Sequence, residues 1–210
     1  TAAVLAACAG PADAPGPTAE AGSAAPAVSG SFDPSAASQL FEPTGASSEG
    51  VPLIVLVPGG GWTSADPAGL TGLATWLSEH GAAVVTVTYR TSTDGAYFPV
   101  PAQDIACDLA DAVRLAGQHG ITIGDVVLVG HSAGAQLAAV VALTPEPYSA
   151  GCAAGPVAPD RFVGLAGPYD VRQVGPVTAA IFGPQGRDPA GWTAGNPVEL
   201  AAERPDLPVL

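Results

Sequence analysis

The sequence contains no lysine, and its positive side chains are six arginines. Nineteen acidic residues outnumber them and give a formal net charge of -13 at pH 7. A nucleic-acid-binding surface needs a basic stripe to neutralise phosphates, and no segment of this sequence carries one. Nucleic acid is therefore not an expected partner, and the acidity is interpreted as a feature that favours solubility.

The sequence also lacks a long apolar run and a metal-binding pattern. No stretch approaches the ~20 apolar residues that a membrane-spanning helix needs. The three histidines are scattered and no Cys-x-x-Cys occurs, so no metal site is expected. With 210 residues, 48% of them hydrophobic and 12% charged, the chain is long enough to bury one sizeable core and is expected to form a single globular domain.

The first ten residues form an apolar run of small side chains that contains Cys8. Leu5-Ala6-Ala7-Cys8 resembles the lipobox of lipoprotein signal peptides, whose cysteine thiol accepts a diacylglyceryl group. No methionine and no basic segment precede it, so residues 1–8 are interpreted as the end of a signal peptide whose beginning is missing. The alternative is an Ala-rich start with a stray cysteine. The first interpretation predicts an extracytoplasmic protein, held at the cell surface by a lipid on Cys8 and touching the membrane only there.

Two further cysteines, Cys107 and Cys152, make an even number for a chain that is expected to be exported. In an oxidising compartment such a pair favours a disulfide, with Cα atoms closer than about 7 Å. The alternative is two separate buried thiols that behave as small hydrophobes.

The chain divides into a tether and a domain. Residues 9–30 are almost wholly Ala, Gly, Pro, Ser and Thr, which bury too little apolar surface to offset the entropy of ordering. The domain is expected over residues 31–210, where β-branched runs alternate with amphipathic segments. This alternation predicts a mostly parallel sheet with helices on both faces, an α/β fold. Strands are expected at 39–41, 52–57, 83–89, 126–129, 162–165 and from 207, and helices at about 66–80, 101–119 and 133–143.

Gly130-His131-Ser132-Ala133-Gly134 follows the strand predicted at 126–129 and precedes an Ala-rich helix. It matches the G-x-S-x-G pattern, in which a sharp strand-to-helix turn presents a nucleophilic serine. The glycines are needed because a Cβ at either position would collide with the neighbouring strand or helix. The five residues alone are a weak signal, but their position between a strand and a helix identifies Ser132 as the candidate nucleophile.

A second motif, Pro58-Gly59-Gly60-Gly61-Trp62, follows the strand predicted at 52–57. It resembles the H-G-G-G loop of lipases and esterases, whose backbone N–H groups bind the oxyanion of the tetrahedral intermediate. The donors here would be Gly60 and Gly61, joined by Ala133. Pro58 stands where that loop usually has histidine, so another group must brace the loop. A phosphate-binding loop is the alternative, but the lysine that it requires is absent.

Together the two motifs resemble those of the α/β-hydrolase superfamily, and within it the hormone-sensitive-lipase-like carboxylesterases with their feruloyl-esterase-like relatives. The resemblance covers about residues 52–210, and segments 164–170 and 196–200 also look like parts of that group. It implies an α/β-hydrolase fold, no cofactor, and a triad in the chain order serine, acid, histidine. In the family the acid usually follows the strand that begins here at Leu207. The sequence is therefore expected to end before the acid, the histidine and the last strands, and to be inactive by itself.

The remaining candidates surround this centre. His80 and His119 end predicted helices, which places them at the sheet edge opposite the nucleophile. His131 is expected to pack beside Ser132 rather than to act as its base. Asp170 is interpreted as a cap for the following segment, with a role as triad acid as the alternative. Residues expected to line a substrate pocket are Trp62, Tyr97, Phe98, His131 and Tyr169, with Tyr89 a further aromatic at the same edge of the sheet.

The sequence thus predicts a serine hydrolase, a carboxylesterase that forms an acyl-enzyme on Ser132 from a small-molecule ester. Two alternatives stay open. One is a non-catalytic lipoprotein that keeps the fold for binding, and the other is an amidase or peptidase that uses the same residues.

Overall fold

A five-stranded sheet forms the centre of the protein in the computed structural model, which describes residues 38–45, 50–183 and 189–210. Its strands lie in the order β1-β3-β2-β4-β5, and β1 is antiparallel to β3 whereas all other neighbours are parallel. The strands are β1 (Gln39–Phe41), β2 (Val51–Val57), β3 (Ala83–Thr86), β4 (Ile123–His131) and β5 (Arg161–Leu165). The mostly parallel sheet predicted from the alternating pattern is confirmed. The interpretations of residues 1–8, with Cys8, and of residues 9–30 lie outside the described residues.

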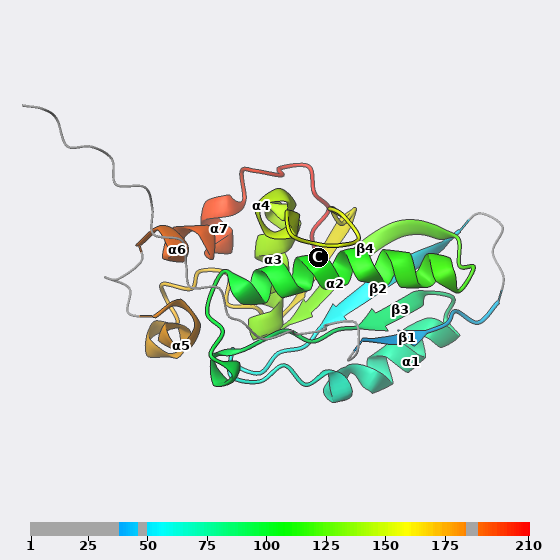
Figure 1. The fold of residues 1–210 in the computed structure, drawn as a ribbon, viewed down its shortest axis with the longest axis horizontal. Coiled ribbons are helices and arrows are strands. Elements are labelled where there is room, and N and C mark those ends of the chain that lie inside the picture. The colour runs from blue at the N-terminus through cyan, green and yellow to red at the C-terminus, as the bar shows by residue number, and fades with distance from the viewer. Residues whose placement is uncertain (1–37, 46–49, 184–188) are drawn as a thin grey trace, which may run out of the picture.

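Helices cover both faces of this sheet (Figure 1). The α-helices are α1 (Thr71–Glu79), α2 (Val100–Gln118), α3 (Ala133–Leu143), α4 (Pro145–Ser149), α5 (Ala179–Phe182), α6 (Pro189–Ala194) and α7 (Pro197–Leu200). Within the described residues, three 3-10 turns accompany them: η2 (Pro67–Leu70), η3 (Ser92–Asp94) and η4 (Gly175–Thr178). No helix among the described residues is both long enough and apolar enough to cross a bilayer.

Alternate side chains of β2 point into two separate apolar cores, because successive residues of a strand face opposite sides of the sheet. On one side, Leu56 packs in a small cluster with α1. On the other, Leu53, Val55 and Val57 lie in the main core with α2 and α3. The helix that follows the candidate nucleophile is buried over almost its whole length, so Ser132 is held at the start of an enclosed helix.

One strand prediction needs correction. The strand expected to reach Tyr89 ends at Thr86. The N–H of Val87 still donates to the carbonyl of Leu56 in β2, at 3.1 Å, and the hydroxyls of Thr88 and Tyr89 then donate to the carbonyls of Ala65 and Pro58.

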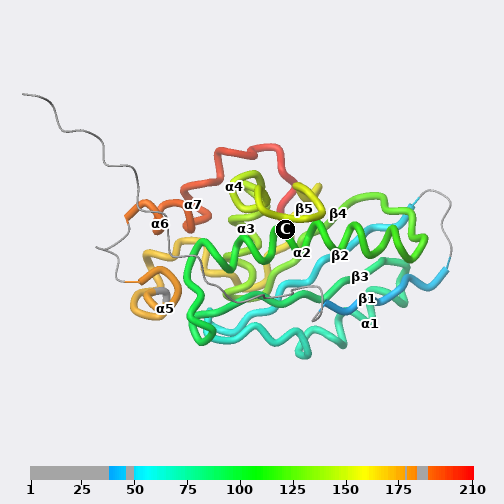
Figure 2. The backbone as a smooth tube through the Cα atoms, viewed as in Figure 1, coloured from blue at the N-terminus to red at the C-terminus, as the bar shows by residue number. Residues whose placement is uncertain are grey.

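The segment expected to start a strand at Leu207 does lie along β5. The N–H of Phe162 donates to the carbonyl of Pro208 and the N–H of Leu210 donates to the carbonyl of Phe162, both at 3.0 Å, around a parallel bridge between Phe162 and Val209. Figure 2 shows the chain after β5 passing through α6 and α7 before it returns to this edge of the sheet.

A disulfide joins Cys107 in α2 to Cys152, which follows α4, with the Cα atoms 4.9 Å apart. The predicted pairing is confirmed. It ties the long helix to the connection between α4 and β5, where few regular hydrogen bonds hold the chain.

Candidate active site

Ser132 lies between the last residue of β4 and the first residue of α3. Its backbone has φ +52° and ψ -121°, a left-handed conformation that is rare for any residue except glycine. The N–H of Ser132 donates to the carbonyl of Leu165 at the end of β5, at 2.8 Å. The sheet therefore holds the strained turn in place and leaves the hydroxyl half-buried at the carboxyl edge of the strands.

The glycines on either side of this turn are sterically required. A Cβ on Gly130 would lie 2.5 Å from the Cα of Ala135, and one on Gly134 would lie 2.2 Å from the carbonyl oxygen of Pro58. Both neighbours are backbone atoms, which cannot move aside as a side chain can. Gly134 thus lets helix α3 approach residues 58–62, the glycine loop, more closely than any other residue would.

The glycine loop turns sharply beside this helix. Gly60 and Gly61 have φ +141° and +60°, and the carbonyl of Gly60 accepts from the N–H groups of Thr63 and Ser64 at 3.1 and 3.2 Å. Among the described residues, no acceptor takes the N–H of Gly60, Gly61 or Ala133. Free N–H groups beside a serine hydroxyl are the arrangement that an oxyanion hole needs.

Side chains from distant segments brace this loop where Pro58 replaces the usual histidine. The buried Tyr89 hydroxyl donates to the carbonyl of Pro58 at 3.1 Å, and burial raises the pKa of Tyr89 well above its ordinary value, so it remains a donor. The indole Nε1 of Trp62 donates to Oε1 of Gln136 at 2.9 Å. The backbone carbonyl of Trp62 is held as well, because it accepts from both the N–H and the hydroxyl of Ser92. Sequence reasoning missed these braces, since no local pattern signals them.

A cavity of about 250 Å³ opens at the nucleophile. It is lined by Gly61, Trp62, Ser132, Ala133, Ala166, Pro168, Val174 and Val177. The glycine loop, the strand-to-helix turn of residues 130–134 (the elbow) and the chain after β5 therefore line one cavity. None of the lining side chains is charged, so the hollow suits an uncharged group.

Of the residues expected to line the pocket, only Trp62 lines this cavity. The ring of Phe98 packs against Tyr148 and Phe182, while Tyr97 is 51% exposed. His131 is exposed, with Nδ1 close to Gly59.

Tyr169 lines a different hollow, of about 360 Å³, between β5, α7 and the 207–210 segment, and its ring meets Phe162 edge to face. Burial raises the pKa of this phenol. The aromatic residues that the sequence predicted to line one substrate pocket therefore lie in separate places in the structure.

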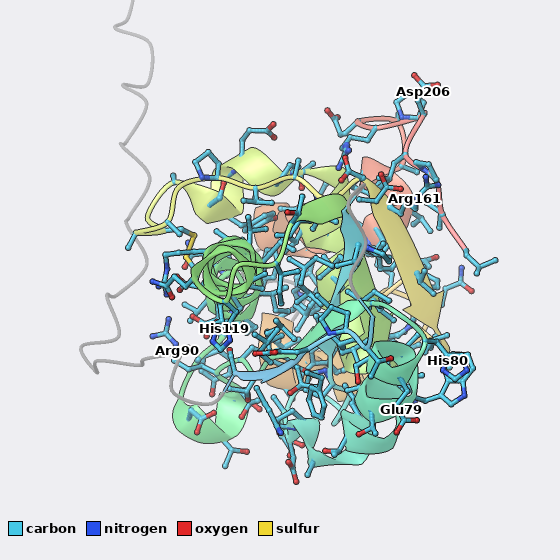
Figure 3. The ribbon with its side chains drawn as sticks, turned by 90° about the vertical axis from the view of Figure 1, so that its right-hand side faces the viewer. Glu79, His80, Arg90, His119, Arg161 and Asp206 are labelled. Carbon is cyan, nitrogen blue, oxygen red and sulfur yellow. A yellow bond between two sulfur atoms is a disulfide. The ribbon has the colours of Figure 1, made fainter. Side chains whose placement is uncertain are left out.

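The other two histidines, labelled in Figure 3, lie at the C-terminal ends of α1 and α2, just before β3 and β4 begin. His80 caps α1, stacks on Trp76 and has Nδ1 2.7 Å from the carbonyl of Trp76. His119 caps α2 and pairs with Glu42 at 2.8 Å. Each precedes a strand that runs away from it toward the elbow, so neither can reach Ser132.

Asp170 has the hydrogen bonds of a cap. Its carboxylate accepts from the side chain of Gln173 at 2.5 Å and from the N–H of Arg172 at 3.3 Å. The bond from Gln173 is the main reason that the pKa of Asp170 lies below its usual value. Within the described part of the chain, no group of three or more His, Cys, Asp or Glu residues is placed to hold a metal ion.

Comparison with known proteins places this geometry in a family. The BD-FAE family model matches residues 39–178. Dipeptidyl aminopeptidase BIII of Pseudoxanthomonas mexicana is 36% identical over 118 residues, which make up 53% of this chain and 17% of that protein.

Among solved structures, esterase B of Lactobacillus rhamnosis superposes with a TM-score of 0.67 at 21% identity, over 81% of this chain and 57% of the esterase chain. The same esterase with a tributyrin phosphonate inhibitor gives 0.64 at 21% identity, over 78% and 55% of the two chains. This chain therefore spans less than two thirds of the length of these relatives. At such identity the likeness shows the fold, and with the matched family model it agrees with the glycine loop and the elbow described above. The chain belongs to the BD-FAE family and has the fold of the α/β-hydrolases.

Proposed function

We propose that the protein is a carboxylesterase that forms an acyl-enzyme on Ser132. The observation that carries the proposal is the left-handed Ser132, which lines one cavity together with Gly61 and Ala133. A serine that bears a backbone strain of this kind at a strand-to-helix turn is characteristic of a nucleophile. The family membership and the esterase fold support hydrolysis as the reaction class.

In the proposed mechanism, the Ser132 hydroxyl attacks the carbonyl carbon of an ester and gives up its proton to a base. The carbonyl oxygen becomes an oxyanion and accepts from the N–H groups of Gly60, Gly61 and Ala133. Collapse of this intermediate breaks the bond to the alcohol, which leaves with a proton, and the acyl group stays on the serine. Water then attacks the acyl-enzyme and releases the acid.

The base is the part of this mechanism that the described residues do not supply. His80 and His119 lie at the far edge of the sheet, and His131 has its ring against Gly59. Because the chain spans less than two thirds of the length of the solved esterases that it matches, we assign the triad acid and histidine to a part of the fold that these 210 residues do not include. On this proposal the 210-residue chain binds an ester but scarcely turns it over, because an oxyanion hole alone leaves only weak catalysis.

The substrate is proposed to be a small-molecule ester that is uncharged at the reacting end. Every side chain that lines the cavity is apolar or, like Ser132, neutral, and the valines of the wall favour an apolar group. A charged acyl group would lose its hydration there without gaining a partner.

A second candidate is amide or peptide hydrolysis. It is favoured by the 36% identity to a protein named as a dipeptidyl aminopeptidase. The same serine, hole and base would perform it, because both reactions pass through a tetrahedral oxyanion. Only the leaving group differs.

The test compares the complete protein, the 210-residue chain and Ser132→Ala of the complete protein. Each is assayed with p-nitrophenyl acetate, with an aminoacyl p-nitroanilide and with a fluorophosphonate probe that labels activated serines. We expect ester turnover and labelling by the complete protein alone. Faster turnover of the anilide would favour the peptidase, and equal rates for the chain and the complete protein would point to His131 as the base. A folded but inactive complete protein would support the non-catalytic binding role.

We also propose that Cys8 of the precursor is lipidated and holds the protein at the cell surface. The lipobox-like Leu5–Cys8 and the tether after it, which is rich in Ala, Gly and Pro, support this location. Expression of the complete gene with a labelled fatty acid should mark the protein, and Cys8→Ala should abolish the label. A label that survives this change would place the anchor elsewhere.

A further inference from the structure

Gln136 is fully buried on α3, one helical turn after Ser132. Its backbone N–H donates to the carbonyl of Ser132 at 3.3 Å. Its side-chain Oε1 accepts from the indole of Trp62 at 2.9 Å, and its Nε2 donates to the carbonyl of Gly195 at 2.6 Å. One side chain therefore links the nucleophile helix, the glycine loop and the segment between α6 and α7.

The two partners of Gln136 demand opposite chemistry. The indole nitrogen of Trp62 can only donate, and the carbonyl of Gly195 can only accept. A side chain between them must accept on one side and donate on the other, which an amide does without a charge. The orientation of the Gln136 amide follows from the partners themselves.

Trp62 transmits this link to the glycine loop. It follows directly after Gly61, it is 3% exposed and it has a left-handed backbone with φ +61°. A bulky residue keeps such a conformation only where its surroundings fix it. Here Ser92 holds its carbonyl and Gln136 holds its indole. If the indole is released, the adjoining N–H groups of Gly60 and Gly61 lose their fixed direction.

The link continues to the wall of the cavity. Asn196 follows Gly195, is also fully buried, and accepts from the N–H of Val171 at 3.0 Å. Val171 lies in the connection between β5 and η4, which supplies Ala166, Pro168 and Val174 to the cavity. The buried amides of Gln136 and Asn196 thus hold the two sides of the cavity.

We propose that Gln136 is the positioning residue that sets the glycine loop against Ser132, in the place of the histidine that Pro58 has replaced. Gln136 does not line the cavity, so it acts through Trp62 and not on the substrate. This inference rests on the proposed esterase function. It predicts that loss of the amide lowers kcat, because oxyanion binding matters in the transition state, and leaves KM nearly unchanged.

The sharpest test is Gln136→Glu in the complete protein, assayed on p-nitrophenyl acetate across pH. Glutamate keeps the shape of glutamine, but its carboxylate cannot donate to the carbonyl of Gly195. Burial raises the pKa of such a carboxyl, and the protonated acid can again accept on one side and donate on the other. We expect kcat to fall about 100-fold at pH 8, because the N–H groups of Gly60 and Gly61 in the oxyanion hole would move by about 1 Å. The ratio of variant to wild-type kcat should rise as the pH falls.

Two further variants keep the test decisive if Gln136→Glu folds poorly. Gln136→Leu should lower kcat at every pH with no recovery in acid, and Trp62→Phe, which removes only the indole donor, should lower kcat about 10-fold. Tyr148→Phe is the matched control. It removes a hydrogen bond of 3.3 Å to the carbonyl of Ala194, next to Gly195, without touching the glycine loop. It should keep the wild-type kcat.

The outcomes separate this inference from the function on which it rests. Wild-type kcat in Gln136→Glu, Gln136→Leu and Trp62→Phe, with Ser132→Ala inactive, would overturn the inference and leave the esterase standing. An equal fall in Tyr148→Phe would also overturn it, because any loss of a hydrogen bond would then have the same effect. A complete protein that neither hydrolyses the ester nor reacts with the probe would overturn both.

Discussion

Gly134→Ala tests the closest approach in the site, that of α3 to the glycine loop. The new Cβ would stand 2.2 Å from the Pro58 carbonyl oxygen and 2.8 Å from that of Val57. Ordinary van der Waals contact begins at 3.4 Å, so the helix and the loop must separate by about 1 Å. Both neighbours are backbone, and no rotamer change can relieve the contact.

Two effects follow from this displacement. Overpacking of a closely packed site costs typically about 1–3 kcal/mol, and we expect the upper half of that range because β2 is fixed on both sides by other strands. The N–H groups of Gly60 and Gly61 also move away from Ser132. A misplacement of about 1 Å at a reacting centre costs about 100-fold in rate.

The assay measures the free energy of unfolding in urea and kcat on p-nitrophenyl acetate, for the complete protein. Gly117→Ala is the matched control, because Gly117 lies in α2 and a Cβ there meets nothing within 4 Å. That change should stabilise the protein by about 0.5–1 kcal/mol through helix propensity and leave kcat unchanged. Gly134→Ala with wild-type stability and rate would refute the close approach and, with it, the argument that this glycine is required.

Three other predictions concern the frame of the site. Replacing Cys107 and Cys152 by alanine should lower the free energy of unfolding by about 4 kcal/mol, since the disulfide closes a loop over a separation of 45 residues. An unchanged urea midpoint would contradict this. Asp104→Ala should lower the free energy of unfolding by about 3 kcal/mol in the same assay, because the N–H and the guanidinium of Arg90 both lose the almost buried carboxylate to which they donate. Asp104→Asn should lower it by less. Asp170→Asn should leave kcat of the complete protein unchanged, because Asp170 caps a turn, and a loss of 100-fold or more would make it the triad acid instead.

Sequence patterns predicted the parts of the protein whose determinants are neighbours in the chain. The alternation of apolar runs predicted β2, β4 and β5 within a few residues, and Asp66 before Pro67 marked the start of η2, where its carboxylate caps Ala68 at 2.9 Å. The strained turn at Ser132 was equally local, because a G-x-S-x-G pattern between a strand and a helix leaves few other conformations. The disulfide followed from the even number of remaining cysteines.

Tertiary structure alone decided what surrounds the nucleophile. Phe98 and Tyr169 follow strands or loops at the edge that carries the site, yet one packs in an aromatic cluster and the other faces a separate hollow. The orientation of such a ring depends on how whole segments pack, which no local pattern encodes.

The same holds for the braces of the glycine loop. Tyr89 binds Pro58 from 31 residues away, and Gln136 binds Trp62 from 74 residues away. In the sequence, Gln136 is one polar residue in an Ala-rich helix, with nothing to distinguish it from a solvent-facing position. Only the folded chain buries it between a donor and an acceptor, because a buried polar group must find partners wherever packing places it.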